Sequence, residues 1–69
     1  MYKYEIILYW SEEDNSYIAE VPELAGCMAD GESMLIALEK VHTVIDEWIE
    51  TAKLIGRDIP KPKGKLAFA

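Results

Sequence analysis

The chain has 69 residues, of which 51% are hydrophobic, and it carries a formal net charge of −6. This length leaves room for a single domain, 1–69, and the acidity argues against a bulk nucleic-acid binder, because phosphate contacts need clustered Lys and Arg. A domain this small buries only about 60% of its unfolded surface, so the high apolar content favours a homo-oligomer, a dimer or a tetramer, over an ordinary well-filled monomer.

The N-terminal third predicts two antiparallel strands joined by a hairpin. Tyr2–Trp10 and Tyr17–Val21 are rich in aromatic and β-branched residues, and the polar run Ser11–Asn15 between them fits a loop. Alternate residues of a strand point to opposite faces of the sheet. The predicted core face contains Tyr2, Tyr4, Ile6, Leu8, Trp10, Tyr17, Ala19 and Val21, and the other face contains Lys3, Glu5, Ile7, Tyr9, Ile18 and Glu20.

The next segments predict a turn, a short strand and, later, an extended tail. Pro22–Gly26 forms the turn, since its proline has no N–H to donate to a ladder, and Cys27–Asp30 is a short third strand. Pro60 and Pro62 prevent a helix and favour an extended run, so Lys65–Phe68 is predicted as a last, edge strand. The fold class is therefore α+β, a small antiparallel sheet with one helix packed on one face. The element order is β-β-β-α-β, or β-β-β-α with an extended tail.

A single amphipathic helix is predicted over Met34–Ile55. Seven apolar residues at alternating steps of four and three lie on one helical stripe, which three more residues widen. The seven are Met34, Leu38, Val41, Ile45, Trp48, Ala52 and Ile55, and the three are Ala37, Val44 and Ile49. Ser33 can cap the first turn, and Gly56 suits the left-handed position after the last. We expect Trp48 to be largely buried between helix and sheet.

The histidine and the cysteine are the two side chains of this sequence with the most versatile chemistry. His42 is the only histidine, and Glu39 and Asp46 lie within reach of it along the helix, but this set lacks enough good ligands for a metal. Cys27 is the only cysteine, so an intramolecular disulfide is excluded. A pairing of Cys27 with His42 would be a nucleophilic site, yet a lone cysteine is more often a small buried hydrophobe.

Three carboxylates could in principle form a two-metal cluster. Asp14, Glu20 and Asp30 fall on loops and opposite strand faces, so we do not expect them to converge. The longest apolar run, Met34–Leu38, is far too short to span a membrane. The sequence predicts a cytoplasmic protein that is not an enzyme and uses no metal or cofactor.

One segment carries a family resemblance. Glu20–Gly31 reads EVPELAGCMADG, and Ser33, Ala37, Leu38 and Val41 follow it. A strand that ends in Pro-Glu-Leu, a Gly-Cys turn, a short strand, a Gly-x-Ser helix start and an Ala-Leu helix face together resemble the HicB antitoxin family. The Tyr-rich first strand and the Ile-Pro-x-Pro segment match as well, so the resemblance covers nearly the whole chain.

The resemblance implies a β-β-β-α-β fold described as a partial ribonuclease H. HicB proteins neutralise HicA, a small basic RNA-cleaving toxin, and many carry a C-terminal DNA-binding domain that represses their operon. Because this chain ends at Ala69, the resemblance is to a short form without that domain, and no direct binding to nucleic acid is expected. The chain departs from the family at Met34–Ile36, where members often have acidic residues.

The predicted function is therefore that of an antitoxin-type protein that binds a HicA-like toxin. The alternatives are a stand-alone oligomeric HicB-like protein of unknown ligand and a degenerate ribonuclease H-like nuclease. The predicted partner-binding residues are Glu5, Ile7, Tyr9, Ile18 and Glu20, on the sheet face opposite the helix; alternatively these residues face water or another copy of the chain. Leu35 and Ile36 lie off the core stripe and are predicted to contact another copy in the oligomer.

Overall fold

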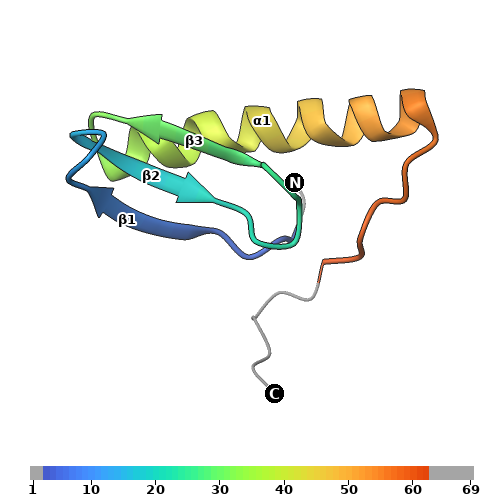
Figure 1. Cartoon of the computed structure of the whole chain (residues 1–69), viewed down its shortest axis with the longest axis horizontal. Coiled ribbons are helices and arrows are strands. Elements are labelled where there is room, and N and C mark those ends of the chain that lie inside the picture. Colours follow the sequence, from blue (N-terminus) through green and yellow to red (C-terminus); the bar gives the residue numbers. More distant parts are fainter. Residues whose placement is uncertain (1–2, 63–69) are drawn as a thin grey trace, which may run out of the picture.

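The structure, a computed structural model, describes residues 3–62, which contain one sheet and one long helix (Figure 1). The elements are β1 (Ile7–Ser11), β2 (Ser16–Glu20), β3 (Met28–Gly31) and α1 (Met34–Ile55). The strands are antiparallel in the order β1-β2-β3, and α1 covers one face of the sheet. The predicted α+β fold is confirmed, whereas the predicted strand Lys65–Phe68 lies outside the described residues.

The first strand is shorter than the sequence predicted. β1 begins at Ile7 rather than Tyr2, and the register pairs Ile7 with Glu20, the last residue of β2. Beyond Glu20 the chain leaves the ladder, because Pro22 has no N–H to donate and the chain turns. The β1–β2 register therefore begins at Ile7.

The turn between β2 and β3 is closed by backbone hydrogen bonds. The N–H of Val21 donates to the Cys27 carbonyl at 2.9 Å, and the N–H of Cys27 donates to the Leu24 carbonyl at 3.0 Å. These three side chains are all buried in the core. The turn therefore does more than connect two strands, because it closes one end of the space between sheet and helix.

The core lies between the sheet and α1, which sits chiefly over β3 and β2 and only touches β1. Its buried members are Tyr4, Ala19, Val21, Leu24, Cys27, Ala37, Val41, Ile45 and Ile49. Because α1 lies over β3 and β2, it leaves β1 less covered. Trp10 faces the helix side of the sheet but stays exposed. Trp10 instead makes an edge-to-face contact with Tyr17, with ring centroids 5.0 Å apart.

The predicted helix bounds are confirmed, but the prediction was wrong about which stripe residues are buried. Met34 and Ile55, at the two ends of the predicted stripe, are exposed. At its C-terminal end α1 extends well past the strands (Figure 1). Trp48 is only half-buried, at the rim of the core, rather than between helix and sheet. The centre of the buried face therefore lies along Ala37, Val41 and Ile45.

Both predicted helix caps are present. The Ser33 hydroxyl accepts a hydrogen bond from the N–H of Ile36 at 3.2 Å. At the other end Gly56 has φ 69°, and the N–H of Arg57 donates to the Ala52 carbonyl at 2.8 Å. This left-handed glycine with its returning hydrogen bond is the usual way to satisfy the last carbonyls of a helix.

Removing the N-cap should lower stability measurably. We expect Ser33→Ala to lower the free energy of unfolding by about 1 kcal/mol, because a first-turn N–H loses its acceptor. Urea unfolding followed by circular dichroism measures this change. The control is Ser33→Asp, which keeps an acceptor and places a negative charge at the positive end of the helix dipole, so its stability should match or exceed that of the parent. Equal losses in both variants would contradict the capping role.

Candidate functional site

The face of the sheet that α1 does not cover is the candidate site, and we call it the open face. The strand register places two rows of side chains on it, Ile7–Glu20–Met28 and Tyr9–Ile18–Asp30. Neighbours within a row belong to directly paired positions, so they lie on the same side of the sheet. Four of the five predicted partner-binding residues therefore share one face, and Glu5 precedes β1 on the same alternation.

The open face exposes large apolar side chains on its two outer strands. Tyr9 is 41% exposed and Met28 is 49% exposed, while Ile7 is half-buried. Ile18, which the sequence placed on this surface as an exposed residue, lies on this face but is only 7% exposed. It belongs to the central strand, so it has neighbours on both sides. Tyr9 and Met28 therefore present most of the apolar contact surface of this face.

The charged side chains that the three strands place on the open face are all negative. Between Lys3 and Lys40 the sequence contains nine acidic residues and no Lys or Arg, and this stretch includes all three strands. Glu20 and Asp30 lie on the face itself. Asp14, from the hairpin loop, and Asp30 line a shallow hollow of about 230 Å³ together with Ile18, Met28 and Ala29. The face thus combines exposed apolar side chains on β1 and β3 with carboxylates on β2, β3 and the hairpin loop, rather than an apolar middle with acidic edges.

Tyr9 is held in place by one of these carboxylates. Its hydroxyl donates a hydrogen bond to Oε2 of Glu20, with 3.5 Å between the oxygens. Partial removal from water raises the pKa of the Tyr9 phenol, and the negative charges of Glu20 and Asp14 raise it further. The phenol therefore remains a neutral donor at neutral pH, and its ring is oriented by the neighbouring strand.

The other chemical candidates do not assemble into one site. Cys27 is buried in the core, and burial raises the pKa of its thiol, so the thiol is protonated at neutral pH. His42 is half-buried on α1. Across residues 3–62, no three His, Cys, Asp or Glu side chains group closely enough to hold a metal ion. Asp14, Glu20 and Asp30 therefore do not form such a group. Within the same residues, no helix has both the length and the apolarity to span a membrane.

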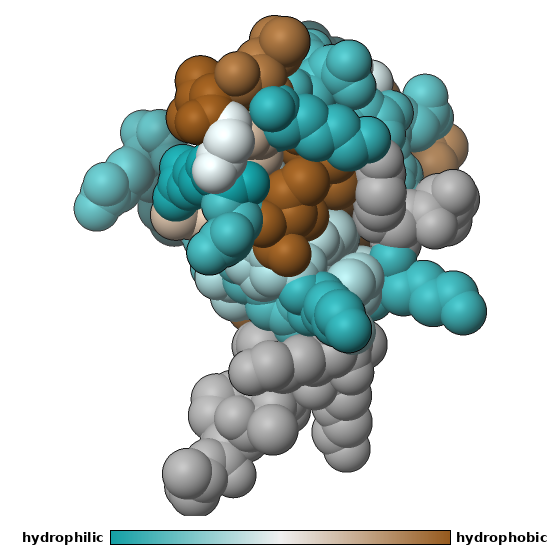
Figure 2. Space-filling view, turned by 90° about the vertical axis from the view of Figure 1, so that its right-hand side faces the viewer, coloured by the Kyte–Doolittle hydropathy of each residue, from teal (hydrophilic) through white to brown (hydrophobic). Residues whose placement is uncertain are grey.

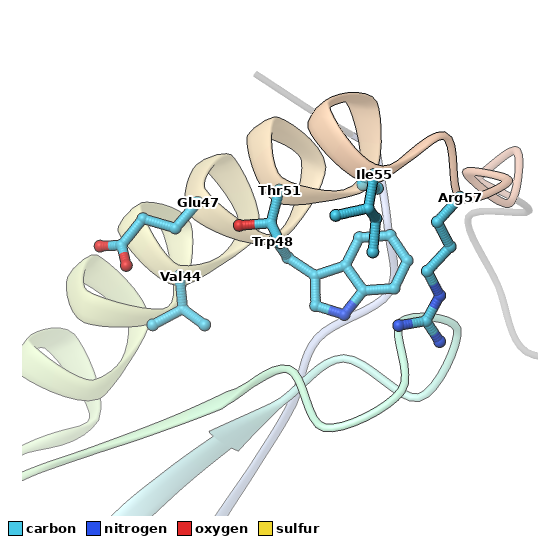
Figure 3. A pocket seen from close by; sticks show the side chains of 7 residues that line it. Val44, Glu47, Trp48, Thr51, Ile55 and Arg57 are labelled. Carbon is cyan, nitrogen blue, oxygen red and sulfur yellow. The ribbon is translucent and has the colours of Figure 1, made fainter.

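A groove beside the end of α1 was not predicted from the sequence. Figure 2 views this end of the molecule and shows apolar surface at the top and in a central hollow between hydrophilic side chains. Figure 3 shows the groove, in which the Trp48 indole faces the Arg57 guanidinium. The guanidinium carbon lies 4.8 Å from the ring centroid, and Trp48 Nε1 donates to the Ala25 carbonyl at 2.9 Å. The groove has a volume of about 220 Å³ and is lined by Val44, Glu47, Trp48, Thr51, Ala52, Ile55 and Arg57.

The described residues define a small α+β domain with a single covering helix and an acidic, apolar open face. A family model described as UPF0150-like matches residues 3–60, and the chain belongs to that family. A UPF0150 protein of Synechocystis sp. is 36% identical over 64 residues, which cover 93% of this chain and 86% of that protein. A UPF0150 protein of Thermoplasma acidophilum is 34% identical over 59 residues, 86% of this chain and 84% of that protein. No solved structure gives a significant match.

Proposed function

We propose that this UPF0150-like protein is a HicB-like antitoxin-type protein that binds and neutralises a small, basic, HicA-type RNA-cleaving toxin, with no catalysis of its own. The resemblance of Glu20–Gly31 and the following helix face to HicB proteins supports the proposal. The observation that carries it is the open face, on which Tyr9 and Met28 are exposed beside Glu20 and Asp30 and the three strands place no Lys or Arg.

The physical basis of neutralisation is competition for the surface that holds RNA. A ribonuclease must present positive charge to bind phosphate groups. An acidic face of matching size pairs with that surface and excludes RNA from it. Glu20 and Asp30 would speed the encounter, because complementary charge chiefly raises the association rate. Tyr9 would hold the complex, since buried aromatic residues are frequent hot spots of protein interfaces.

The test is the affinity for a small basic protein encoded beside this one. We expect Tyr9→Ala to weaken binding by about 2 kcal/mol, the threshold of an interface hot spot. The double variant Glu20→Lys with Asp30→Lys should weaken it further and lower the association rate. Calorimetry gives the affinity, and stopped-flow mixing gives the rate. The RNA-cleaving activity of the partner should fall as wild-type protein is added.

The matched control carries the same change of charge on the opposite side of the molecule. Glu39→Lys with Asp46→Lys alters two exposed residues of α1, which lies behind the sheet as seen from the open face. Binding should be nearly unchanged in this variant. Equal losses in the two double variants would show that only net charge matters, and unchanged binding in both open-face variants would exclude this face. RNA cleavage that needs a metal ion and only this protein would favour the nuclease alternative instead.

A further inference from the structure

One flank of α1 carries a regular series of residues outside the buried face, of which Val44 packs against the core. We call it the helix flank, and it consists of Ile36, Lys40, Val44, Glu47, Thr51 and Ile55. At 100° per residue these six positions fall within about 100° of one side of the helix. Val44 is half-buried and the other five are exposed, Ile36 at 39% and Ile55 at 68%. Ile36 packs partly against Gly31, and both isoleucines keep exposed apolar surface at the ends of this flank.

The helix flank has an apolar feature at each end. At its C-terminal end, four of its residues line the groove beside Trp48, and Figure 3 shows Val44, Glu47, Thr51 and Ile55 on this side of the helix. At its N-terminal end, Ile36 projects beside Gly31. With a rise of 1.5 Å per residue, Ile36 and Ile55 are about 28 Å apart along the helix axis. An exposed isoleucine and an apolar groove thus lie at opposite ends of the same surface.

The spacing of the helix flank is the same when read in either direction. The steps are four, four, three, four and four, so a two-fold axis midway between Val44 and Glu47 maps the six positions onto one another. A second copy packed antiparallel would place its Ile55 against Ile36, and its Ile36 against Ile55, in the groove. Lys40 would then lie opposite Thr51 of the other copy and about one helical turn from its Glu47, so the charges are complementary as well.

We propose that a second copy of this chain docks on the helix flank, giving a two-fold dimer with antiparallel α1 helices. Such an interface is isologous, because the same patch serves on both subunits. Ridges of side chains on paired helices interdigitate at about 8–10 Å between axes, which suits the half-buried Val44 at the centre of the flank. The open face lies on the far side of the sheet from α1, so both copies keep it free.

In this dimer Ile36 contacts the other copy and Leu35 does not. The sequence alone predicted an oligomer contact for both residues. Leu35 is the more exposed of the two, at 64%, but it lies about 100° further round the helix, outside the helix flank. The two adjacent residues therefore form a matched pair for an experiment. Both are large, aliphatic and exposed in the first turn of α1, and they differ mainly in the side of the helix from which they project.

The experiment measures the mass of the full chain by sedimentation equilibrium at micromolar concentrations. Wild type and Leu35→Lys should both be dimeric. Ile36→Lys and Ile55→Glu should each weaken the dimer by roughly tenfold or more, because each places a charge against an apolar side chain. A 1:1 mixture of these two variants should recover the dimer. In the mixed dimer one end pairs the new lysine with the new glutamate, and the other end keeps both isoleucines.

Several results would overturn the proposal. The proposal would be wrong if the wild-type protein were a monomer. It would also be wrong if Leu35→Lys dissociated the dimer while Ile36→Lys left the dimer intact. Failure of the mixture to recover the dimer would exclude the antiparallel pairing of Ile36 with Ile55. Circular dichroism of each variant checks that α1 is intact, and the mixture itself guards against misfolding, because only folded variants can recover the dimer. None of these outcomes depends on the toxin partner, so this proposal and the proposed function fail separately.

Discussion

Replacing Ile45 with alanine should lower the free energy of unfolding by about 2–5 kcal/mol, the range for large-to-small changes in a core. Ile45 is 1% exposed and lies at the middle of α1, where the helix faces the sheet. Its side chain packs in the cluster that joins α1 to Ala19, Val21 and Leu24. The loss combines the transfer of the missing carbons from the core with the cavity they leave. A small domain has a total stability near the lower end of about 5–15 kcal/mol, so this change removes a large part of it.

Urea unfolding of the purified variant measures this loss. The control is Leu35→Ala, which removes a similar aliphatic side chain from an exposed position of the same helix. We expect the control to change stability by no more than about 0.5 kcal/mol, as is usual for surface substitutions. Similar effects of the two variants would show that the buried side of α1 has been placed incorrectly.

Gly31→Ala should destabilise the protein toward the upper end of about 1–3 kcal/mol, the usual range for overpacking. Gly31 is the last residue of β3 and lies against the start of α1. A Cβ atom at this position would lie 2.6 Å from the backbone nitrogen of Ala37 and 2.8 Å from Cγ2 of Ile36. The first contact is with backbone, so the whole first turn of the helix must move. We expect the Ala37 amide, which donates to the Ser33 carbonyl, to lose protection from hydrogen exchange.

The control for this steric effect is Gly26→Ala. Gly26 has φ 75° and would meet no atom within 4 Å, so an added Cβ there causes backbone strain alone. This strain should cost about 1–2 kcal/mol and should leave hydrogen exchange at the start of α1 unchanged. If Gly31→Ala leaves the protection of the Ala37 amide intact, then the close approach of β3 and α1 does not limit the residue at this position.

The open face could be predicted only in part from the sequence. Alternation along the first two strands identified Tyr9, Ile18 and Glu20 as sharing a face, and the register confirms it. Met28 and Asp30 were missed, although the same alternation along the short third strand places them opposite the core residue Cys27. The depth of Ile18 could not be predicted, because the alternation gives the side of the sheet but not the neighbours of a side chain.

The position of Trp48 shows a second limit. The helical period placed it on the apolar stripe, and it does contact the core. Its half-exposed position at the groove depends on where the sheet lies beneath α1. The strands lie under the N-terminal half of α1 (Figure 1), and Trp48, nearer the C-terminal end, meets the Ala25 carbonyl and Arg57 instead. No pattern in the helix alone specifies where the sheet lies beneath it.

The sequence by itself determined α1 from Met34 to Ile55, because each of its ends depends on residues within a few positions along the chain. The hydroxyl of Ser33 satisfies an N–H three residues later, and Gly56 adopts a left-handed conformation that other residues avoid. Only the tertiary structure decided where β1 begins and how α1 lies across the sheet. Those features depend on pairs far apart in sequence, such as Ile7 with Glu20 and Gly31 with the first turn of α1, whose contacts exist only once the chain has folded.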